Sequence, residues 1–388
     1  MRTILEPERE IPVVDEADVL VVGGGTAGLP AALAAARSGA DVLVLERYGY
    51  VGGASSGGLV ITLPADRQGV ITSEMEERLM KVGAAAIMDK DWLAWCPETF
   101  KWMGLKMLEE CKARMLFHSW CVGCVVEDNR IDSVIIESKA GRQAIKAKVV
   151  VDCTGDADIA AFAGAPYTKG DDSGEMQSVT MMFMMSNLDE EKYKSGKPLS
   201  KPLQNMGRRI TSIYPGHLNV WGGRIEGIDG TDPRDLTKAE NELRKQVFEW
   251  AFWTKRNMPG CEDAYISMTS PQLGVRETRL IMGEYRLCKS DWDAKTMFPD
   301  HIGFAYVDNS IPYRAILPQK VDNLLVGGRC VSFERDILNP MRLIPPCMVT
   351  GYAAGMAAAL SVQDDTAPRN LDVSKLQSAL KSSGVLFP

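Results

Sequence analysis

The start of the chain alternates short apolar runs with a helical pattern. Residues 18–22 (DVLVV) are almost entirely apolar, which is typical of a parallel strand covered on both faces. Residues 29–39 (LPAALAAARSG) place alanine and leucine at helical spacing and close with Gly39. A second apolar run, residues 41–45 (DVLVL), ends before Glu46. The pattern therefore predicts a strand, a turn, a helix and a second strand.

Two helices and three strands are expected next. One helix is predicted to start near Ser73, because Ser73 and Glu76 have the spacing of a capping box. The other is predicted over residues 97–114, with Pro97 in its first turn. Tight polar turns then separate three strand-like runs, which predicts an antiparallel meander. The runs are residues 115–127, 131–137 and 144–152.

The middle of the chain has a different pattern. A long helix is predicted over residues 237–256, with Thr237 and Glu240 as a capping box. A methionine-rich run, residues 181–185, is interpreted as core filler. Proline-bearing loops surround both features, so we expect a second, α+β domain that is inserted into the first.

After this region the pattern of the first domain returns. Residues 323–326 (NLLV) predict a short strand before Gly327 and Gly328, and residues 347–360 predict a late helix. We therefore predict an α/β protein, in which a Rossmann-like domain combines a parallel sheet with an antiparallel β-meander. The predicted boundaries are residues 1–165 and 318–388 for this domain and residues 166–317 for the inserted substrate-binding domain.

Composition and charge exclude several classes of function. The 388 residues carry a net charge of -7, which argues against nucleic acid as a partner. The chain shows neither an apolar run of membrane-spanning length nor a secretory signal, and its nine cysteines lack a regular framework. We therefore expect a cytoplasmic protein with reduced thiols. Cys121 and Cys124 form a C-x-x-C, but no second pair with zinc spacing follows, so we interpret them as core thiols and predict no metal site.

A glycine motif joins the first predicted strand to the first predicted helix. Gly23, Gly25 and Gly28 form G-x-G-x-x-G, in which the glycines allow a tight turn, close approach of a pyrophosphate, and packing of the helix on the strand. Glu46 follows Gly28 by 18 residues, at the tip of the second strand, where its carboxylate can accept hydrogen bonds from ribose hydroxyls. The predicted dinucleotide site also includes Thr26, Ala27 and Arg47.

A second glycine loop favours FAD over NAD. Gly52 and Gly53 follow Glu46 closely, which suits a longer cofactor that passes between two loops. The predicted meander, in place of another strand–helix pair, is also the crossover expected of FAD domains.

Four stretches of the sequence resemble a known protein family: residues 18–53, 149–167, 270–287 and 324–360. They resemble the bacterial FAD-dependent oxidoreductase family of the glutathione-reductase-like superfamily, which is distantly similar to the flavoprotein subunit of fumarate reductase. The resemblance implies a second FAD contact at Thr154, Gly155 and Asp156, with Val122 beside the adenine. It also implies non-covalent FAD, because residues 54–56 (ASS) hold no histidine where covalent relatives carry one.

The same resemblance implies a third FAD contact near the end of the chain. Gly327 and Gly328 match the glycine pair that precedes it. Arg329 stands where wider relatives have an aspartate, which leaves its role open. The late helix is expected to point its N-terminus at the flavin, so that N–H groups near Val349 and Thr350 stabilise negative charge on the reduced ring.

Arginines are the main candidates for substrate binding. Arg276 and Arg314 lie in the predicted insertion, and Arg342 precedes the late helix. A guanidinium binds a carboxylate bidentately and stays charged. For Arg276 and its neighbour Arg279 the alternative is a structural ion-pair network, with Glu277 and Glu284 as the partners.

Histidines are weaker candidates for proton transfer. His217 and His301 lie in predicted loops of the insertion, where imidazole can act as a general acid or base, whereas His118 lies on a meander strand and is interpreted as structural. The candidate catalytic set is Arg276, His301, Arg314 and Arg342.

The sequence thus predicts an enzyme that moves a hydride between flavin N5 and a small polar or anionic molecule. NAD(P)H, a quinone or O2 are the candidate electron partners, and a homo-oligomer is compatible with the sequence. The alternative is a non-catalytic or electron-relay subunit of a larger redox complex. It is disfavoured because close C-x-x-C-x-x-C runs for iron–sulfur clusters are missing.

Overall fold

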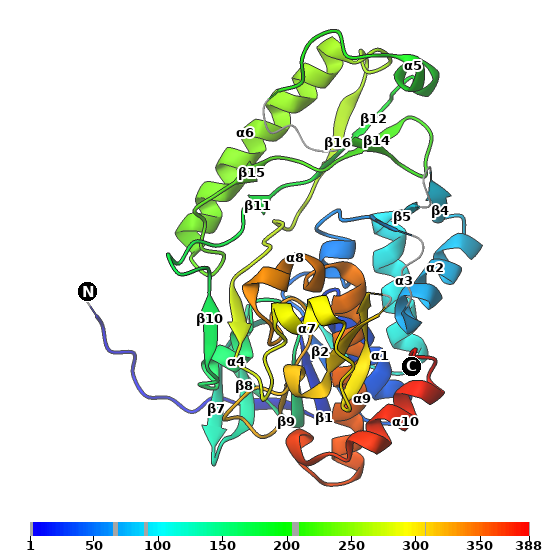
Figure 1. The fold of residues 1–388 in the computed structure, drawn as a ribbon. Helices are drawn as coiled ribbons and strands as arrows, with labels where there is room; N and C mark the ends of the chain where they lie inside the picture. The colour runs from blue at the N-terminus through cyan, green and yellow to red at the C-terminus, as the bar shows by residue number, and fades with distance from the viewer. Residues whose placement is uncertain (1–2, 65–68, 89–91, 204–208, 307, 388) are drawn as a thin grey trace.

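The computed structural model describes residues 3–64, 69–88, 92–203, 209–306 and 308–387. A large body holds both ends of the chain, and a smaller upper lobe is built from the middle of the chain (Figure 1). The body combines a sheet with helices, so the predicted α/β class is confirmed.

A seven-stranded sheet forms the centre of the body. Its order is β6-β2-β1-β9-β8-β7, and β20 lies beside the end of β9. β6, β2, β1, β9 and β20 pair in parallel, whereas β7, β8 and β9 form the predicted antiparallel meander. The strands are β1 (Val13–Val22), β2 (Val42–Leu45), β6 (Arg114–Leu116), β7 (Trp120–Glu127), β8 (Arg130–Ser138), β9 (Gly141–Asp152) and β20 (Leu324–Val326).

The predicted strand 115–127 is in fact two strands. His118 has a φ of 56°, in the left-handed region, and the chain turns there. The segment before the turn, β6, pairs with β2, and the segment after it, β7, starts the meander.

Two helices of the body pack closely against each other. They are α1 (Gly28–Arg37) and α9 (Ile344–Gln363), and both are almost wholly buried. A Cβ on Gly351 would lie 2.1 Å from the carbonyl oxygen of Ala27, and one on Gly355 would lie 1.9 Å from that of Ala31. The glycines of the late helix therefore serve helix packing, which hydropathy alone does not reveal.

The upper lobe has its own hydrophobic core. Its four-stranded sheet, in the order β13-β14-β12-β16, is covered by the long helix α6. Met181, Phe183 and Met185 face this core, whereas Met182 and Met184 pack into the core of the body. The elements are β11 (Val179–Thr180), β12 (Phe183–Ser186), α5 (Glu190–Ser195), β13 (Arg209–Thr211), β14 (His217–Val220), β15 (Arg224–Ile225), α6 (Pro233–Asn257) and β16 (Tyr265–Thr269).

The lobe's core covers less of the chain than the predicted insertion 166–317. Residues after Arg279 pack into the body, among them Leu280, Ile302 and Tyr313. The elements of this returning segment are β10 (Tyr167–Lys169) paired with β17 (Arg279–Ile281), then α7 (Lys289–Ala294), β18 (His301–Tyr306) and β19 (Asn309–Pro312).

Both predicted capping boxes are wrong. Helix α2 (Val70–Lys81) begins before Ser73, with Gly69 as its N-cap. Helix α6 begins at Pro233, and the Asp232 carboxylate accepts the N–H of Arg234 at 2.7 Å. The remaining body elements are β3 (Thr62–Pro64), β4 (Ala85–Met88), β5 (Trp92–Trp95), α3 (Pro97–Glu110), α4 (Asp158–Phe162), α8 (Leu338–Met341) and α10 (Val373–Ser382).

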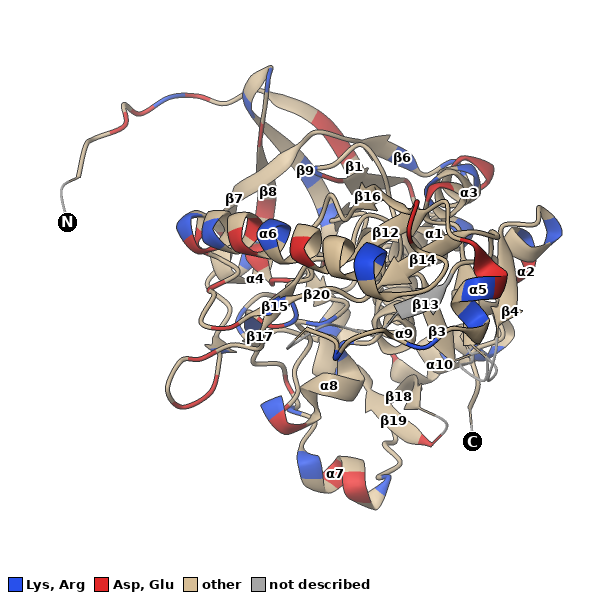
Figure 2. Ribbon diagram, turned by 90° about the horizontal axis from the view of Figure 1, so that it is seen from above, with Lys and Arg blue, Asp and Glu red and all other residues tan. Residues whose placement is uncertain are grey.

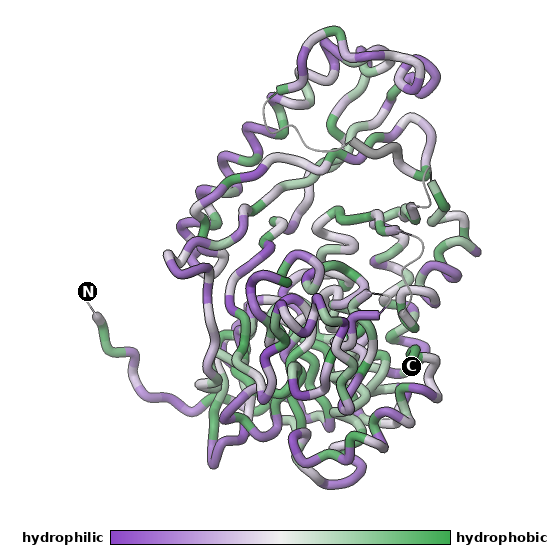
Figure 3. Tube along the Cα trace, in the orientation of Figure 1, coloured by the Kyte–Doolittle hydropathy of each residue, from purple (hydrophilic) through white to green (hydrophobic). Residues whose placement is uncertain are grey.

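Charged residues lie on the outside of the lobe's long helix, and apolar residues lie inside the body. Lysine, arginine and acidic residues alternate along the outer side of α6 (Figure 2), and the hydrophobic segments concentrate inside the body (Figure 3). Among the described residues, we find no single helix that is long and apolar enough to cross a membrane. The segments Arg335–Met341 and Ile344–Gln363 reach that length together, but they are bent by 92° and most of the second one is buried in the body.

Candidate functional site

The loop between β1 and α1 has the geometry that the glycine motif requires. Gly23 has a φ of 94°, which favours glycine. A Cβ on Gly28 would lie 1.7 Å from the carbonyl oxygen of Gly23, so the helix and the strand leave no room for a side chain. A Cβ on Gly25 would meet nothing nearer than 3.8 Å. Gly23 and Gly28 therefore build the turn, and Gly25 leaves open space above it.

The second glycine loop lies against the first, as predicted. The N–H of Gly52 donates to the carbonyl of Gly24 at 2.8 Å, and the Thr26 hydroxyl donates to the carbonyl of Gly52 at 3.2 Å. A Cβ on Gly53 would lie 2.9 Å from the Cα of Gly25. The two loops thus form one continuous backbone surface.

A small cleft of about 70 Å³ opens beside these loops. Val122, predicted to lie by the adenine, occupies a β-bulge of β7 and does not line the cleft, whereas its neighbours Trp120 and Cys121 do. Sequence reasoning missed several lining residues, among them Ser119, Trp120, Asp158 and Gln272. The full lining is Val22, Gly23, Gly25, Leu45, Glu46, Arg47, Gly53, Ser119, Trp120, Cys121, Cys153, Thr154, Asp158 and Gln272.

Glu46 lies at the end of β2 in this cleft and is only 9% exposed. Its carboxylate accepts the N–H groups of Gly24 and Tyr48, both at 2.9 Å, which fixes its orientation. Burial raises the pKa of Glu46 above its ordinary value. Arg47 lies over the ring of Trp120, 5.4 Å from its centroid, and this contact forms the outer wall.

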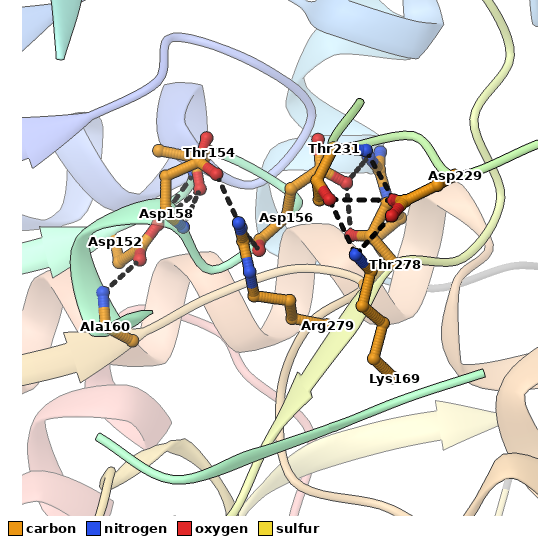
Figure 4. Close-up of polar contacts among 11 residues, drawn as sticks. Asp152, Thr154, Asp156, Asp158, Ala160, Lys169, Asp229, Thr231, Thr278 and Arg279 are labelled. Carbon is orange, nitrogen blue, oxygen red and sulfur yellow. Dashed lines mark hydrogen bonds and ion pairs between the residues drawn. The ribbon is translucent and has the colours of Figure 1, made fainter. Parts of the chain in front are cut away.

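Asp156 is the centre of a polar cluster behind the cleft. Its carboxylate accepts the Thr278 hydroxyl and the Arg329 guanidinium, both at 2.5 Å, and its carbonyl accepts from Arg279 at 2.9 Å. Figure 4 shows Thr154, Asp156, Thr278 and Arg279 converging from the body and from the segment that leaves the lobe. Arg329 thus forms an ion pair within the protein.

The predicted third FAD contact, between the glycine pair 327–328 and the start of the late helix, has a different geometry in the structure. The N–H of Gly328 donates to the Thr350 hydroxyl at 3.0 Å, which joins the glycine pair to α9. Val349 and Thr350 lie in the second turn of α9, because the helix begins at Ile344. Their N–H groups therefore bond within the helix and do not face a ligand.

Two of the four predicted catalytic residues are committed to structural contacts. His301 is 2% exposed, and its ring nitrogens contact the Ser310 hydroxyl at 2.7 Å and the Leu386 carbonyl at 3.4 Å. Burial lowers the pKa of His301. Arg314 donates twice to Asp300, at 2.9 and 3.2 Å. Neither residue lines the cleft, and a catalytic role for either stays a prediction.

Arg276 and Arg342 are partly buried arginines whose hydrogen bonds go to uncharged groups. Arg276 donates to the hydroxyl and carbonyl of Ser178, and Arg342 to the side chain of Asn339. Within the described residues neither has an ion pair with a carboxylate. Burial, then the charges of Arg342 and Arg224, lower the pKa of Arg276 to about 10. The charge of Arg342 in the body thus acts on Arg276 in the segment that leaves the lobe.

The neighbouring ionic groups are paired. Glu277 accepts Arg335 at 2.7 Å, and Arg279 donates to Asp158 at 2.8 Å. Glu284 accepts Arg369 at 2.9 Å. Arg279 thus forms an ion pair, as the structural alternative expected, but its partner is Asp158, whereas the expected partners Glu277 and Glu284 bind Arg335 and Arg369.

These features define a dinucleotide-binding protein of the flavoprotein type, with two glycine loops and an acidic residue beside one cleft. The chain belongs to the family of FAD dependent oxidoreductases, whose sequence profile matches residues 18–309 and 306–380.

Relatives of known sequence match little more than a third of this chain. Thiamine thiazole synthase of Sulfolobus acidocaldarius is 34% identical over 168 residues, which cover 38% of this chain and 59% of that protein. Digeranylgeranylglycerophospholipid reductase 1 of Methanopyrus kandleri is 28% identical over 151 residues, covering 36% and 40%. The matched region thus spans about two fifths to three fifths of these relatives.

Solved structures share the fold over nearly the whole chain. A geranylgeranyl bacteriochlorophyll reductase-like protein from Thermoplasma acidophilum superposes with a TM-score of 0.53 at 14% identity, covering 95% of this chain and 84% of that one. p-Nitrophenol 4-monooxygenase from Pseudomonas putida gives 0.54 at 12% identity, covering 95% and 88%.

The cleft fits the cofactor of this family. The open space at Gly25 and the N-terminus of α1, which has no side-chain cap, suit a pyrophosphate. The Glu46 carboxylate suits ribose hydroxyls. FAD is thus the cofactor, and Gly23, Gly25, Glu46 and Gly53 are the residues positioned to hold it.

Proposed function

We propose that this enzyme oxidises or reduces a small anionic molecule whose carboxylate binds Arg276 and Arg342. Bound FAD supplies the two-electron chemistry, as hydride exchange at its N5 atom. The protein's own residues hold the substrate, orient it and exclude water.

The uncompensated arginine pair is the observation that carries this proposal. Two partly buried guanidinium groups repel each other, and burial of an unpaired charge is costly. The lowered pKa of Arg276 reflects both effects. A substrate carboxylate would relieve the repulsion and accept bidentate hydrogen bonds. The remaining donors of Arg342 support this role, since its buried Nε has no partner among the described residues.

The two arginines come from different parts of the fold. Arg276 follows the lobe's last strand, and Arg342 lies between α8 and α9 of the body. A substrate held by both would lie where the lobe meets the body, as is common for ligand sites. We also propose kinship with the fumarate reductase flavoprotein and a cytoplasmic location, with NAD(P)H, a quinone or O2 as the electron partner.

A reduction assay under anaerobic conditions tests the substrate class. FAD-loaded enzyme is mixed with 2-hydroxy acids, dicarboxylates and enoates, and each acid is paired with its uncharged methyl ester. For oxidisable compounds we expect flavin bleaching with acids at concentrations where their esters are inert. For enoates we expect reoxidation of pre-reduced flavin. Equal reactivity of the esters would overturn the anionic substrate, and reaction only with a protein electron donor would favour the relay alternative.

A further inference from the structure

Gln272 lies in the cofactor cleft although it belongs to the segment that leaves the upper lobe. It follows β16 and lines the same cleft as Gly23, Gly25 and Gly53. We infer that Gln272 is an FAD-binding residue and that the lobe seats on the cofactor through it.

The backbone around Gln272 is held in place from both sides. Its N–H donates to the carbonyl of Gly57 at 3.3 Å, and the N–H of Ser270 donates to the carbonyl of Met182 at 2.8 Å. One contact is to the loop after Gly53, and the other is to the residue that precedes β12 of the lobe. The position of the Gln272 side chain in the cleft is therefore set by the main chain.

The side-chain oxygen of Gln272 needs a hydrogen-bond donor. This Oε1 is buried and has no partner among the described residues. A buried polar atom without a partner is costly, so such an atom in a ligand cleft indicates a ligand contact. Phosphate oxygens accept hydrogen bonds but do not donate them. The matching donors on the cofactor are the ribityl and ribose hydroxyls, the adenine amino group and the N3–H of the flavin ring.

The lobe also rests on the second glycine loop at another point. Asn219 of β14 donates through Nδ2 to the carbonyl of Leu59 at 3.4 Å. Because Gln272 and Asn219 contact the same loop region, cofactor binding and seating of the lobe are energetically coupled. Removal of FAD is then expected to loosen the lobe's contact with residues 57–59.

The test measures FAD affinity of the apoprotein, independently of turnover. Gln272→Leu keeps similar bulk but removes the amide, and Gln272→Asn keeps an amide that is too short. Ser270→Ala is the matched control, since Ser270 is buried in the same segment, its hydroxyl also lacks a partner, and it does not line the cleft. Thermal melts of each apoprotein show whether it is folded.

Titration with FAD, followed by flavin fluorescence, is expected to show an increase in Kd of about tenfold for both Gln272 variants. Ser270→Ala is expected to stay within about twofold. Hydrogen exchange at residues 57–59 should be faster in the apoprotein and in FAD-saturated Gln272→Asn than in the wild-type holoprotein. If a folded Gln272 variant binds FAD as tightly as the wild type, or if Ser270→Ala weakens binding equally, the inference is overturned.

Discussion

The Arg329 guanidinium donates to the Asp156 carboxylate at 2.5 Å, across 173 residues of sequence. Arg329 follows the glycine pair after β20, and Asp156 follows β9. A Cβ on Gly155 would lie 2.9 Å from the guanidinium, so the turn needs glycine there to admit the arginine. The Thr278 hydroxyl reaches the same carboxylate. One acidic side chain therefore joins both halves of the body to the segment returning from the lobe.

Asp156→Ala is expected to destabilise the protein by about 3 kcal/mol, because it leaves a largely buried arginine without its partner. Urea unfolding of the apoprotein measures this loss. Asp293→Ala is the control, since its ion pair with Lys289 is about half exposed on both sides and should contribute below about 1 kcal/mol. If the two variants lose the same free energy of unfolding, the Asp156 ion pair stabilises the protein no more than an exposed ion pair does.

Two glycines of the same motif are expected to respond in different ways. Gly28→Ala places a methyl group 1.7 Å from a carbonyl oxygen, so the variant should unfold or melt far below the wild type. Gly25→Ala meets no atom nearer than 3.8 Å, so its apoprotein should melt normally, yet the methyl group should block the pyrophosphate. Thermal melts and FAD titration of both apoproteins check this. Normal FAD affinity in Gly25→Ala would mean that the pyrophosphate binds elsewhere.

FAD affinity is expected to depend on pH through Glu46. Its raised pKa means that the carboxylate becomes protonated as the pH falls through that value, and it then accepts ribose hydroxyls less well. Affinity should therefore weaken toward acid pH. For stability of the apoprotein the sign is opposite, since a raised pKa favours the folded state at low pH and this contribution is lost as the pH rises through the folded-state pKa.

Glu46→Ala is expected to weaken FAD binding by about 1–3 kcal/mol near neutral pH. Glu46→Gln should remove most of the pH dependence. Both effects are measured by titrating apoprotein with FAD across a pH series. If the wild-type affinity for FAD does not change with pH and both variants bind FAD normally, the carboxylate lies outside the cofactor site.

Local patterns were sufficient to predict the cofactor loops. The glycine motif, Glu46 and the meander depend on neighbouring residues in the sequence, because strand and turn signals are local. The second glycine loop was also predictable, since Gly52 and Gly53 follow the second strand directly.

Contacts between distant segments could not be predicted in this way. Arg314 was a candidate for substrate binding until its partner Asp300 was known, and Arg276 was a candidate for an ion pair with Glu277, which in fact binds Arg335. Which carboxylate an arginine meets is decided by packing. Gln272 illustrates the same limit, because its place in the cleft depends on how the lobe's return segment crosses the second glycine loop.

The last prediction concerns the arginine pair. Arg342→Ala is expected to keep its FAD and to lower kcat/KM by about 10²-fold or more, because a preorganised charge that meets the substrate is lost. Arg276→Ala should act in the same direction. The double variant should lose less than the product of both effects, since the two groups bind one carboxylate. Arg342→Lys should restore little activity if the contact is bidentate.

Arg244→Ala is the control, because Arg244 lies on the outer side of α6 and pairs with Glu240. Steady-state kinetics on folded, FAD-loaded protein, using an acid identified in the reduction assay, measure these effects. Normal turnover by Arg342→Ala would make this arginine structural and would leave Arg276 and Arg224 as the groups to examine for substrate binding.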